Sequence, residues 1–399
     1  MEILLVTNSC SSLKYREILE NRTRNILDPQ QKYFRLLAEG LAAHKDVSVR
    51  IFSVLPLSAS CYPQKIFKYS SEEENNVTYE YIPFLNGRIL RYITLFLSSL
   101  YLIFRWCLRN RNKDSIVICD PLTMMAAVPC RFIAQCFGVK AVALITDIPS
   151  LVSSNKKIHG KFRQKISDFY DSFADGECYK YDSYITLTES INERLNITNK
   201  PYCIVEGLAD SGDLQIQSEH DNYIMYAGGV YEIYGVKNLV EAFVKLGRSD
   251  LELHIYGSGT FVEDLKEVSK EYKNIQYKGC LPAEQIVEIE KNALLLVNPR
   301  PVAEDFSKYS FPSKTIEYLL SGTPLLSTKL PGIPKEYFDF IYAIDEDSVI
   351  GIYNGLNKVL MNSKKVLAAR GKEGHEFIIN KKNNVVMAEK VIELAKSII

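Results

Sequence analysis

Short apolar runs alternate with longer segments of helical period along the whole chain of 399 residues. Short runs rich in β-branched residues predict buried strands, and apolar residues spaced three and four apart predict helices that cover them. Alternating strands and helices are typical of parallel sheets with helices on both faces, so we expect an α/β protein. The predicted strands are 3–7, 47–54, 77–82, 115–119, 141–145, 184–187, 223–227, 251–256, 275–277, 294–297, 324–327 and 340–344. The predicted helices include 31–44, 124–137, 236–246, 261–269 and 282–292.

The most polar stretch, residues 209–222, contains little that could be buried and is predicted to be a linker. On either side of it we expect a doubly wound Rossmann-like domain, residues 1–208 and residues 223–380. Residues 381–399 are predicted to form a C-terminal helix that packs back toward the N-terminal domain. Two domains also agree with the length of the chain, at about 150 residues for a typical domain.

Charge and composition remove several classes of function. Lys and Arg number 48 and Asp and Glu number 48, so no overall field attracts nucleic acid and no nucleic-acid partner is expected. The nine Cys form no CxxC pair and the five His are far apart, so we expect no metal, no cofactor and no disulfide framework. A reducing compartment, the cytoplasm, fits this cysteine usage. The first apolar run has no positive region before it, which favours a strand over a signal peptide.

Candidate chemistry lies in the strand-to-helix turns, because ligands of open parallel sheets bind beyond the carboxyl ends of the strands. The strand 223–227 is followed by Gly228 and Gly229 and then by a predicted helix. Two glycines let the backbone pass close to a ligand, and a helix N-terminus offers N–H groups to an anion. A tight turn that binds nothing would have the same sequence, and the chain has no GxxxxGK[ST] phosphate-binding loop.

A second informative turn lies in NPRPVAEDFSKYSFPSKTIEYLLSGTP, residues 298–324. Pro312 can open a helix and the glycine and proline at 322 and 324 can close it, so we predict a helix over 312–321. The first turn of this helix offers amide groups at Ser313 and Lys314, which suit a phosphate.

Three charged side chains of this segment suit a nucleotide. Lys314 and Glu317 lie on one helix face, so Lys314 could meet a diphosphate while Glu317 accepts hydrogen bonds from the two ribose hydroxyls. Arg300, in the preceding loop, could add a fork of donors to the same diphosphate. The alternative is an ion pair between Lys314 and Glu317 and a solvated Arg300.

Together these segments resemble the GT-B glycosyltransferases, specifically the large bacterial group called group 1 or family 4. YAGGVYEIYGVKNLVEAF, residues 226–243, resembles the first strand, turn and helix of that family's nucleotide-binding domain. NPRP and the later KYSFPSKTIEYLLSGTPLLSTKLPGIPKEY, residues 308–337, resemble the donor-site segment of members that build bacterial polysaccharides.

The resemblance implies two Rossmann-like domains that face a central cleft. It implies a UDP- or GDP-sugar donor held mainly by the C-terminal domain, and a glycan or polyprenyl-linked acceptor held by the N-terminal domain. The implied activity is transfer of a hexose without a metal and with retention of anomeric configuration, in the synthesis of a capsule or exopolysaccharide.

The resemblance also assigns residues, with some departures from the family. Many members carry Arg and Lys at the positions of Gly229 and Tyr234, and Tyr309 replaces the first of two family glutamates, of which Glu317 matches the second. Two other carboxylates, Glu304 and Asp305, lie nearby but out of register. The implied donor-binding residues are Gly228, Gly229, Arg300, Tyr309, Ser310, Phe311, Pro312, Ser313, Lys314 and Glu317.

In the N-terminal domain, the strand 141–145 leads into Asp147, where other members carry His-Asp. The resemblance implies that Asp147 contacts the acceptor or the donor sugar, and that Arg300 and Lys314 are the other catalytic residues. The alternative for Asp147 is a buried carboxylate that caps the next turn. Asp120 is a second candidate for the same task, and His159 is expected to be a solvated loop residue.

Two other functions fit the same sequence. One is a nucleotide-sugar epimerase of GT-B fold, which needs further acid and base carboxylates and turns over without an acceptor. The other is a non-catalytic subunit that binds a sugar nucleotide, which Tyr309 and the missing Arg and Lys would suit.

The segment 89–106 is apolar nearly all round, and its longest uncharged stretch, 92–104, is too short to span a bilayer. Such a segment is either buried or in contact with lipid. We expect an outer face in the membrane interface, with arginines on lipid phosphates, and thus a cytoplasmic protein peripheral to the inner face of the cell membrane. The residues expected at the interface are Phe96, Leu100, Phe104 and Trp106, with Arg88, Arg91 and Arg105.

Overall fold

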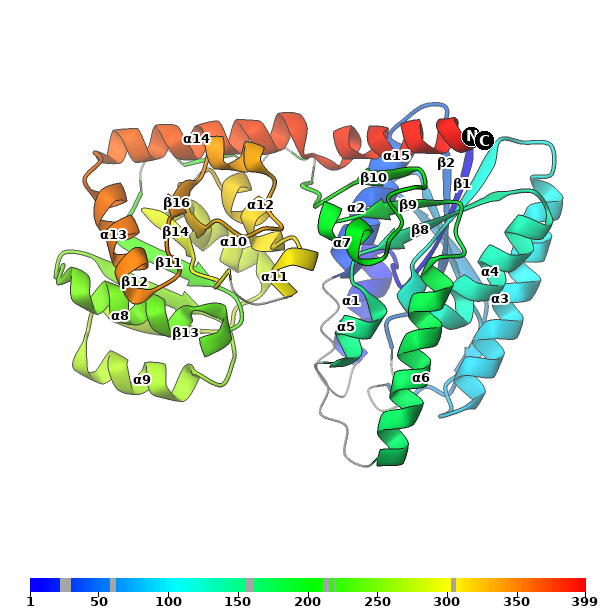
Figure 1. Cartoon of the computed structure of the whole chain (residues 1–399), viewed down its shortest axis with the longest axis horizontal. Helices are drawn as coiled ribbons and strands as arrows, with labels where there is room; N and C mark the ends of the chain where they lie inside the picture. Colours follow the sequence, from blue (N-terminus) through cyan, green and yellow to red (C-terminus); the bar gives the residue numbers. More distant parts are fainter. Residues whose placement is uncertain are drawn as a thin grey trace. The chain divides into compact units, whose positions relative to one another are not determined.

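The computed structural model describes residues 1–21, 30–57, 62–154, 161–210, 212, 215–217, 220–302 and 306–399. The chain divides into two compact units (Figure 1). The first unit is Met1–Asp210 together with Asn384–Ile399, and the second is Ser211–Asn383. Each unit is built on a largely parallel sheet with helices packed against it, so the predicted α/β class with two Rossmann-like units is confirmed.

The sheet of the first unit has the strand order β10-β9-β8-β7-β1-β2-β5-β4. All neighbours run parallel except β4, which pairs antiparallel with β5 at one edge. The central strand β1 is buried along Ile3–Thr7, as a parallel sheet covered on both faces requires. The strands are β1 (Glu2–Thr7), β2 (Ser48–Ser53), β4 (Ser70–Glu74), β5 (Val77–Tyr81), β7 (Ser115–Cys119), β8 (Lys140–Ile145), β9 (Ser183–Thr186) and β10 (Tyr202–Ile204), and β3 (Ile66–Phe67) pairs separately with β6 (Phe84–Leu85).

The helices of the first unit connect these strands. They are α1 (Ser12–Asn21), α2 (Gln30–Ala42), α3 (Leu90–Arg109), α4 (Met124–Cys136), α5 (Pro149–Ser154), α6 (Lys161–Cys178), α7 (Glu189–Arg194), the 3-10 helix η1 (Pro121–Thr123) and the last helix of the chain, α15 (Asn384–Ile398).

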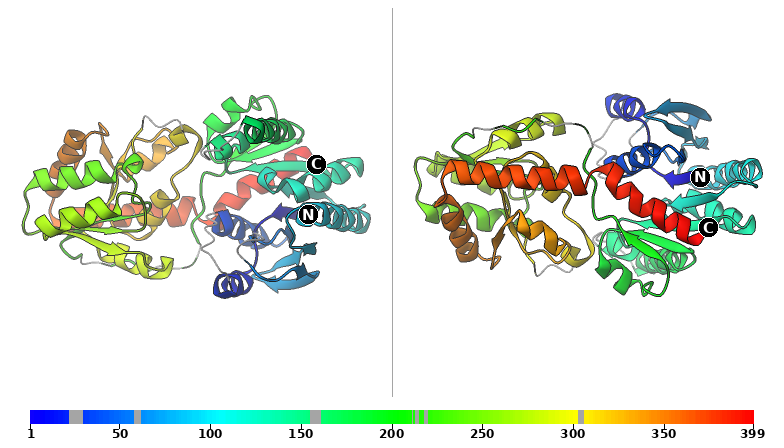
Figure 2. Two further views of the ribbon diagram at one scale, coloured as in Figure 1. Left: turned by 90° about the horizontal axis from the view of Figure 1, so that it is seen from below. Right: turned by 90° about the horizontal axis from the view of Figure 1, so that it is seen from above.

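Helix α15 packs against α2 within the first unit (Figure 2). The N–H of Asn384 donates to the carbonyl of Ala209 at 2.8 Å, and the Asn384 side-chain amide donates to the carbonyl of Leu36 in α2 at 3.2 Å. A Cβ on Gly40 of α2 would lie 2.1 Å from the Asn384 carbonyl oxygen. Glycine at position 40 is therefore what lets the two helix backbones approach.

Helix α3 has one buried face and one long exposed face, which corrects part of the sequence prediction. Trp106 is buried at 5% exposure, so it is a core residue and not a membrane residue. Arg91 donates to the carbonyl of Leu57 and lies over the ring of Phe84 at 4.9 Å, so it too is held by the protein. The exposed large apolar residues of α3 and its entry are Ile89, Leu90, Tyr92, Ile93, Leu97, Leu100, Tyr101, Phe104 and Leu108.

The sheet of the second unit is parallel throughout the described residues and has the order β13-β12-β11-β14-β15-β16. In Figure 1, α10, α12 and α14 lie on one side of this sheet and α8 and α9 on the other. The strands are β11 (Tyr223–Ala227), β12 (Glu252–Tyr256), β13 (Ile275–Gly279), β14 (Leu295–Asn298), β15 (Leu325–Thr328) and β16 (Tyr342–Ile344). The helices are α8 (Val236–Leu246), α9 (Val262–Glu271), α10 (Ala283–Asn292), α11 (Phe306–Tyr309), α12 (Ser313–Leu320), α13 (Val349–Leu360) and α14 (Lys364–Lys381), with 3-10 helices η2 (Glu232–Tyr234) and η3 (Lys335–Asp339).

The packing of α8 illustrates how this core forms. Val236, Leu239, Val240 and Phe243 recur at helical spacing and are buried against the apolar side chains of the sheet. The helix begins and ends at glycines in the left-handed conformation, Gly235 at φ 76° and Gly247 at φ 63°.

Candidate active site

The order of the second sheet places a topological switch point between β11 and β14. From β11 the chain continues to β12 on one side, and β14 later pairs with β11 on the other side. The loops that leave β11 and β14 therefore diverge, which is where open parallel sheets bind ligands. The predicted donor residues lie in the turn after β11 and in the segment that runs from the end of β14 through α11 to α12.

The turn after β11 is held by the backbone of the neighbouring strand exit. The N–H of Gly228 donates to the carbonyl of Tyr256 at 3.0 Å, and the Tyr226 hydroxyl donates to the carbonyl of Gly229 at 2.9 Å. A Cβ on Gly257 would lie 1.8 Å from the Gly228 carbonyl oxygen, and one on Gly259 would lie 2.0 Å from the Val230 carbonyl oxygen. The glycines at 257 and 259 thus allow two loops to pack backbone against backbone, a role that the sequence did not reveal.

Helix α12 is bonded to the end of β11. The Tyr318 hydroxyl accepts a hydrogen bond from the N–H of Ala227 at 2.8 Å and donates one to the carbonyl of the same residue at 3.0 Å. Tyr318 is 1% exposed, so these bonds are shielded from water. Lys314 lies one turn earlier on the helix, with its ammonium group 5.9 Å from the centre of the Tyr318 ring. The structure therefore brings Lys314 toward the glycine turn.

Arg300 lies in the loop after β14 and meets both other segments. Its guanidinium lies 5.6 Å from the centre of the Tyr234 ring, a cation–π arrangement, and a guanidinium nitrogen lies 3.5 Å from the Ser310 hydroxyl. Its carbonyl accepts a hydrogen bond from the Thr328 hydroxyl at 2.6 Å. Many members of the family that the sequence resembles carry Lys at the position of Tyr234. In this structure the Tyr234 ring instead packs against the guanidinium of Arg300.

Lys314 and Glu317 form the ion pair that the sequence left open as the alternative. The Lys314 ammonium nitrogen lies 2.9 Å from the Glu317 carboxylate and 3.9 Å from the carboxylate of Glu290. Burial alone would lower the pKa of Lys314, but the charges of Glu317 and Glu290 outweigh it and the pKa is raised. Lys314 is thus firmly protonated, and its donor role stays a prediction.

Sequence reasoning missed Glu290, although a signal was present. It lies in α10, four residues after the buried Ile286, so helical spacing places it on the apolar face of that helix. Its side chain is 1% exposed. A carboxylate on the buried face of an amphipathic helix is costly without a cationic partner, and that cost would have pointed to a nearby Lys or Arg.

The remaining donor predictions differ in what they offer a ligand. Phe311 and Pro312 are buried, and the Phe311 ring packs against the ring of Tyr337 at 5.5 Å, so both support the start of α12. Ser313 is exposed at the first residue of α12, and Tyr309 is half-buried at the end of α11. The candidates Glu304 and Asp305 lie outside the described residues, as does His159 of the first unit.

In the first unit, Asp147 follows β8 and is half-buried. The side-chain amide of Gln30, at the start of α2, donates to the Asp147 carboxylate at 2.9 Å and to the Thr146 hydroxyl at 2.7 Å. Asp120 follows β7, is fully buried and accepts a hydrogen bond from the N–H of Leu122 at 2.9 Å. Asp120 therefore caps the 3-10 helix η1, whereas the function expected of Asp147 stays a prediction.

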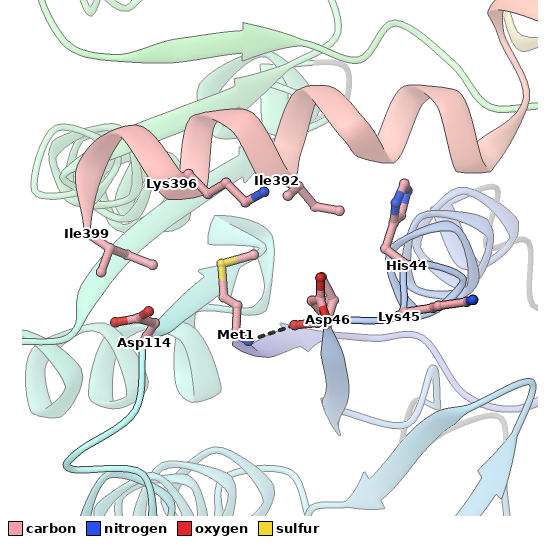
Figure 3. Close-up of a pocket in the computed structure, with 9 residues that line it drawn as sticks. Met1, His44, Lys45, Asp46, Asp114, Ile392, Lys396 and Ile399 are labelled. Atoms are coloured by element: carbon pink, nitrogen blue, oxygen red, sulfur yellow. Dashed lines mark hydrogen bonds between the residues drawn. The ribbon is translucent and has the colours of Figure 1, made fainter.

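The described residues contain no cluster of His, Cys, Asp and Glu that could hold a metal ion. A cavity of about 440 Å³ lies under α15 at the amino ends of β1 and β2, lined by side chains that include His44, Asp46 and Lys396 (Figure 3). Its position is opposite to the strand ends where ligands of parallel sheets bind.

Comparison with known proteins agrees with this architecture. In sequence, the chain is similar to an uncharacterized glycosyltransferase of Methanocaldococcus jannaschii, with 22% identity over 259 residues. The match covers 59% of this chain and 65% of that protein, less than two thirds of its length. In structure, the chain is similar to sucrose-phosphate synthase from Thermosynechococcus elongatus, with a TM-score of 0.66, 12% identity and coverage of 100% of this chain and 99% of that one. It is also similar to the UDP complex of Anabaena HepE, with a TM-score of 0.61, 12% identity and full coverage of both chains.

The two Rossmann-like units and these structural likenesses define a protein with the GT-B fold. Residues 214–383, nearly the whole second unit, match the family model described as glycosyl transferases group 1. The resemblance of the sequence to the group 1 glycosyltransferases is thus confirmed over residues 214–383.

Proposed function

We propose that this protein transfers a hexose from a nucleotide-diphosphate sugar to a glycan acceptor, with retention of anomeric configuration. The observation that carries the proposal is the gathering of Arg300, Lys314 and the Gly228 turn at the switch point of the second sheet. Cationic side chains and backbone N–H groups at such a point suit the diphosphate of a departing nucleotide.

The donor is held by the second unit in this proposal. Arg300 and Lys314 neutralise the diphosphate without a metal ion, and Glu317 turns from Lys314 to the ribose hydroxyls when the donor binds. The solved structure of Anabaena HepE, which is similar in fold, contains bound UDP. This supports a UDP-sugar as the first donor to test. Asp147 of the first unit contacts the transferred sugar or the acceptor.

The nucleotide is tested by thermal unfolding in the presence of UDP, GDP, ADP and CMP. A ligand that binds only the folded state stabilises it, so one nucleotide should raise the Tm of the wild type. The same nucleotide should raise the Tm of Arg300→Ala by a smaller amount. The exposed Lys329→Ala variant serves as the matched control, since Lys329 pairs on the surface with Asp345 at 2.8 Å. If no nucleotide raises Tm, the proposed donor class is wrong.

The reaction is tested with radiolabelled nucleotide sugars. A transferase releases nucleotide slowly by hydrolysis and faster with an acceptor, an epimerase converts the sugar without an acceptor, and a binding subunit does neither. Conversion of the sugar, or no turnover with any donor that raises Tm, would replace the proposal by one of these two alternatives.

For the acceptor we propose a lipid-linked glycan, such as one on a polyprenyl carrier, in the synthesis of a capsule or exopolysaccharide. Support comes from α3. Its exposed stripe includes Ile93, Leu97 and Tyr101, it contains no acidic residue, and Arg105 and Arg109 are exposed near its end. An exposed apolar stripe flanked by arginines suits an anionic membrane surface.

The protein is then cytoplasmic and peripheral to the membrane. In the described part of the chain no helix has the length and apolar character needed to cross a bilayer. Co-sedimentation with phosphatidylglycerol vesicles at low salt should pellet the wild type, and high salt should release it. Ile93→Ser/Leu97→Ser and Arg88→Glu/Arg105→Glu/Arg109→Glu should both weaken binding, whereas Lys266→Glu/Lys270→Glu on α9 should not. Wild-type protein that stays in the supernatant would contradict the membrane proposal.

A further inference from the structure

Glu290 is a buried carboxylate that the proposed donor chemistry leaves without a task. It belongs to α10, and its side chain is 1% exposed. Burying a charged carboxylate is costly unless a cation compensates it. The Lys314 ammonium lies 3.9 Å from the Glu290 carboxylate and supplies a compensating positive charge.

Lys314 therefore lies between two carboxylates of different character. Glu317 is 2.9 Å away, one turn along the same helix, and 26% exposed, so solvent and a ligand can reach it. Glu290 is 3.9 Å away on another helix and inaccessible. A ligand that takes the oxygens of Glu317 leaves Lys314 with Glu290 as its remaining counter-charge.

We infer that Glu290 is a positioning residue for Lys314, a fixed buried counter-charge that holds the ammonium group in place and protonated when Glu317 turns to the donor. This inference rests on the proposed donor role of Lys314 and Glu317. Without Glu290 the flexible Lys314 side chain can leave the position at which the diphosphate departs. Negative charge grows on the leaving diphosphate in the transition state. Loss of the Lys314 position therefore removes more stabilisation from the transition state than from the bound donor.

The test is a double-mutant cycle with Glu290→Gln, Lys314→Met and their combination. Glu288→Gln is the matched control, because Glu288 lies on the same helix, is 66% exposed and pairs with Lys291. Glu290→Gln should lower kcat by about tenfold, while the donor KM should change by less than about threefold. An effect of this size is usual for the coupling between two groups in contact. In the Lys314→Met background the same substitution should leave kcat unchanged, and Glu290→Asp, which keeps the charge, should recover part of the loss.

Thermal unfolding gives a readout that needs no substrate. Lys314→Met removes this cation from beside the buried carboxylate and should lower Tm by about 5–10 °C, and adding Glu290→Gln should return most of that loss. Equal effects of Glu290→Gln in both backgrounds, on Tm or on kcat, would overturn the inference. If wild type shows no turnover with any donor, the proposed function fails, while the Tm cycle still decides whether Glu290 and Lys314 act as a pair.

Discussion

The hydroxyl of Tyr318 bonds both backbone groups of Ala227, accepting from its N–H at 2.8 Å and donating to its carbonyl at 3.0 Å. One side chain thereby ties helix α12 to the last residue of strand β11. The glycine turn that starts at Gly228 and the helix that carries Lys314 are held as one rigid piece.

Tyr318→Phe should lower the free energy of unfolding by about 1–3 kcal/mol, because it leaves two buried backbone groups of Ala227 without this partner. Urea unfolding measures the loss. Tyr272→Phe, on the surface end of α9, is the control and should stay within about 0.5 kcal/mol of wild type. Equal midpoints for the two variants would show that the Tyr318 bonds contribute nothing.

Gly235→Ala should be far more destabilising than Gly247→Ala, although both residues cap α8 with positive φ. A Cβ at 235 would lie 2.1 Å from the carbonyl oxygen of Pro299, whereas a Cβ at 247 would meet nothing within 4 Å. Gly247→Ala should therefore cost only the left-handed strain of about 1–2 kcal/mol. Circular dichroism melts compare the two. Similar Tm values would mean that the loop before Arg300 can move away from the helix.

Arg300→Ala and Lys314→Ala should lower kcat by about 10²–10³ and donor affinity much less, because their charge meets the charge that grows on the leaving diphosphate. Steady-state kinetics at varied donor concentration separates the two effects. EDTA should leave the wild-type rate unchanged. A rate that EDTA abolishes and Mg²⁺ or Mn²⁺ restores would contradict the metal-independent chemistry proposed for these side chains.

Glu317→Gln should weaken donor binding by roughly 1.5–3 kcal/mol, the worth of hydrogen bonds to a charged group. Equilibrium binding of the nucleotide that raises Tm is the measurement. Glu373→Gln is suited as the control, because Glu373 is 57% exposed and pairs on the surface with Arg370 at 3.5 Å. If Glu317→Gln binds the nucleotide as tightly as the wild type does, Glu317 does not contact the ribose and serves only as the ion-pair partner of Lys314.

Acid should destabilise the second unit. Burial lowers the pKa of His220, although the carbonyl of Lys291 near its ring opposes the shift. Burial also lowers the pKa of His254, which is stacked on Tyr223, although the nearby Glu252 opposes the shift. The folded state then binds fewer protons than the unfolded chain, so stability is present above the ordinary pKa of 6.5 and is lost as the pH falls below it.

The measurement is Tm at pH 7.5 and pH 5.5 for wild type and for His220→Asn/His254→Gln. The double variant should show a smaller loss of Tm between the two values. A wild-type Tm that rises on acidification would contradict the direction of both pKa shifts.

The fold was largely predictable because buried parallel strands are short apolar runs. The strand 223–227 has the predicted bounds, and the helix predicted over 312–321 is found at Ser313–Leu320. The two-residue strands β3 and β6 were missed, since so short a run carries no periodicity. Nearly all of segment 89–106 lies in helix α3, but its apolar residues on all sides did not reveal which face is buried. Trp106 was therefore wrongly expected at the membrane interface.

Contacts across the fold were beyond the sequence alone. Local spacing predicts the approach of Lys314 and Glu317, because they share one helix face. It cannot predict that Glu290, on a different helix, lies near the same ammonium group. Nor can it predict that Tyr234 lies under Arg300, because these two residues meet only through the pairing of β11 with β14.

The return of the chain to the first unit at Asn384 has a consequence for its synthesis. The bond from the Asn384 N–H to the carbonyl of Ala209 joins the points where the chain leaves and re-enters that unit, so the second unit is an insertion. On the ribosome, the whole inserted unit is synthesised before α15 is. Until then the face of α2 around Gly40 lacks the helix that covers it. The unit that begins first is therefore the last to be completed.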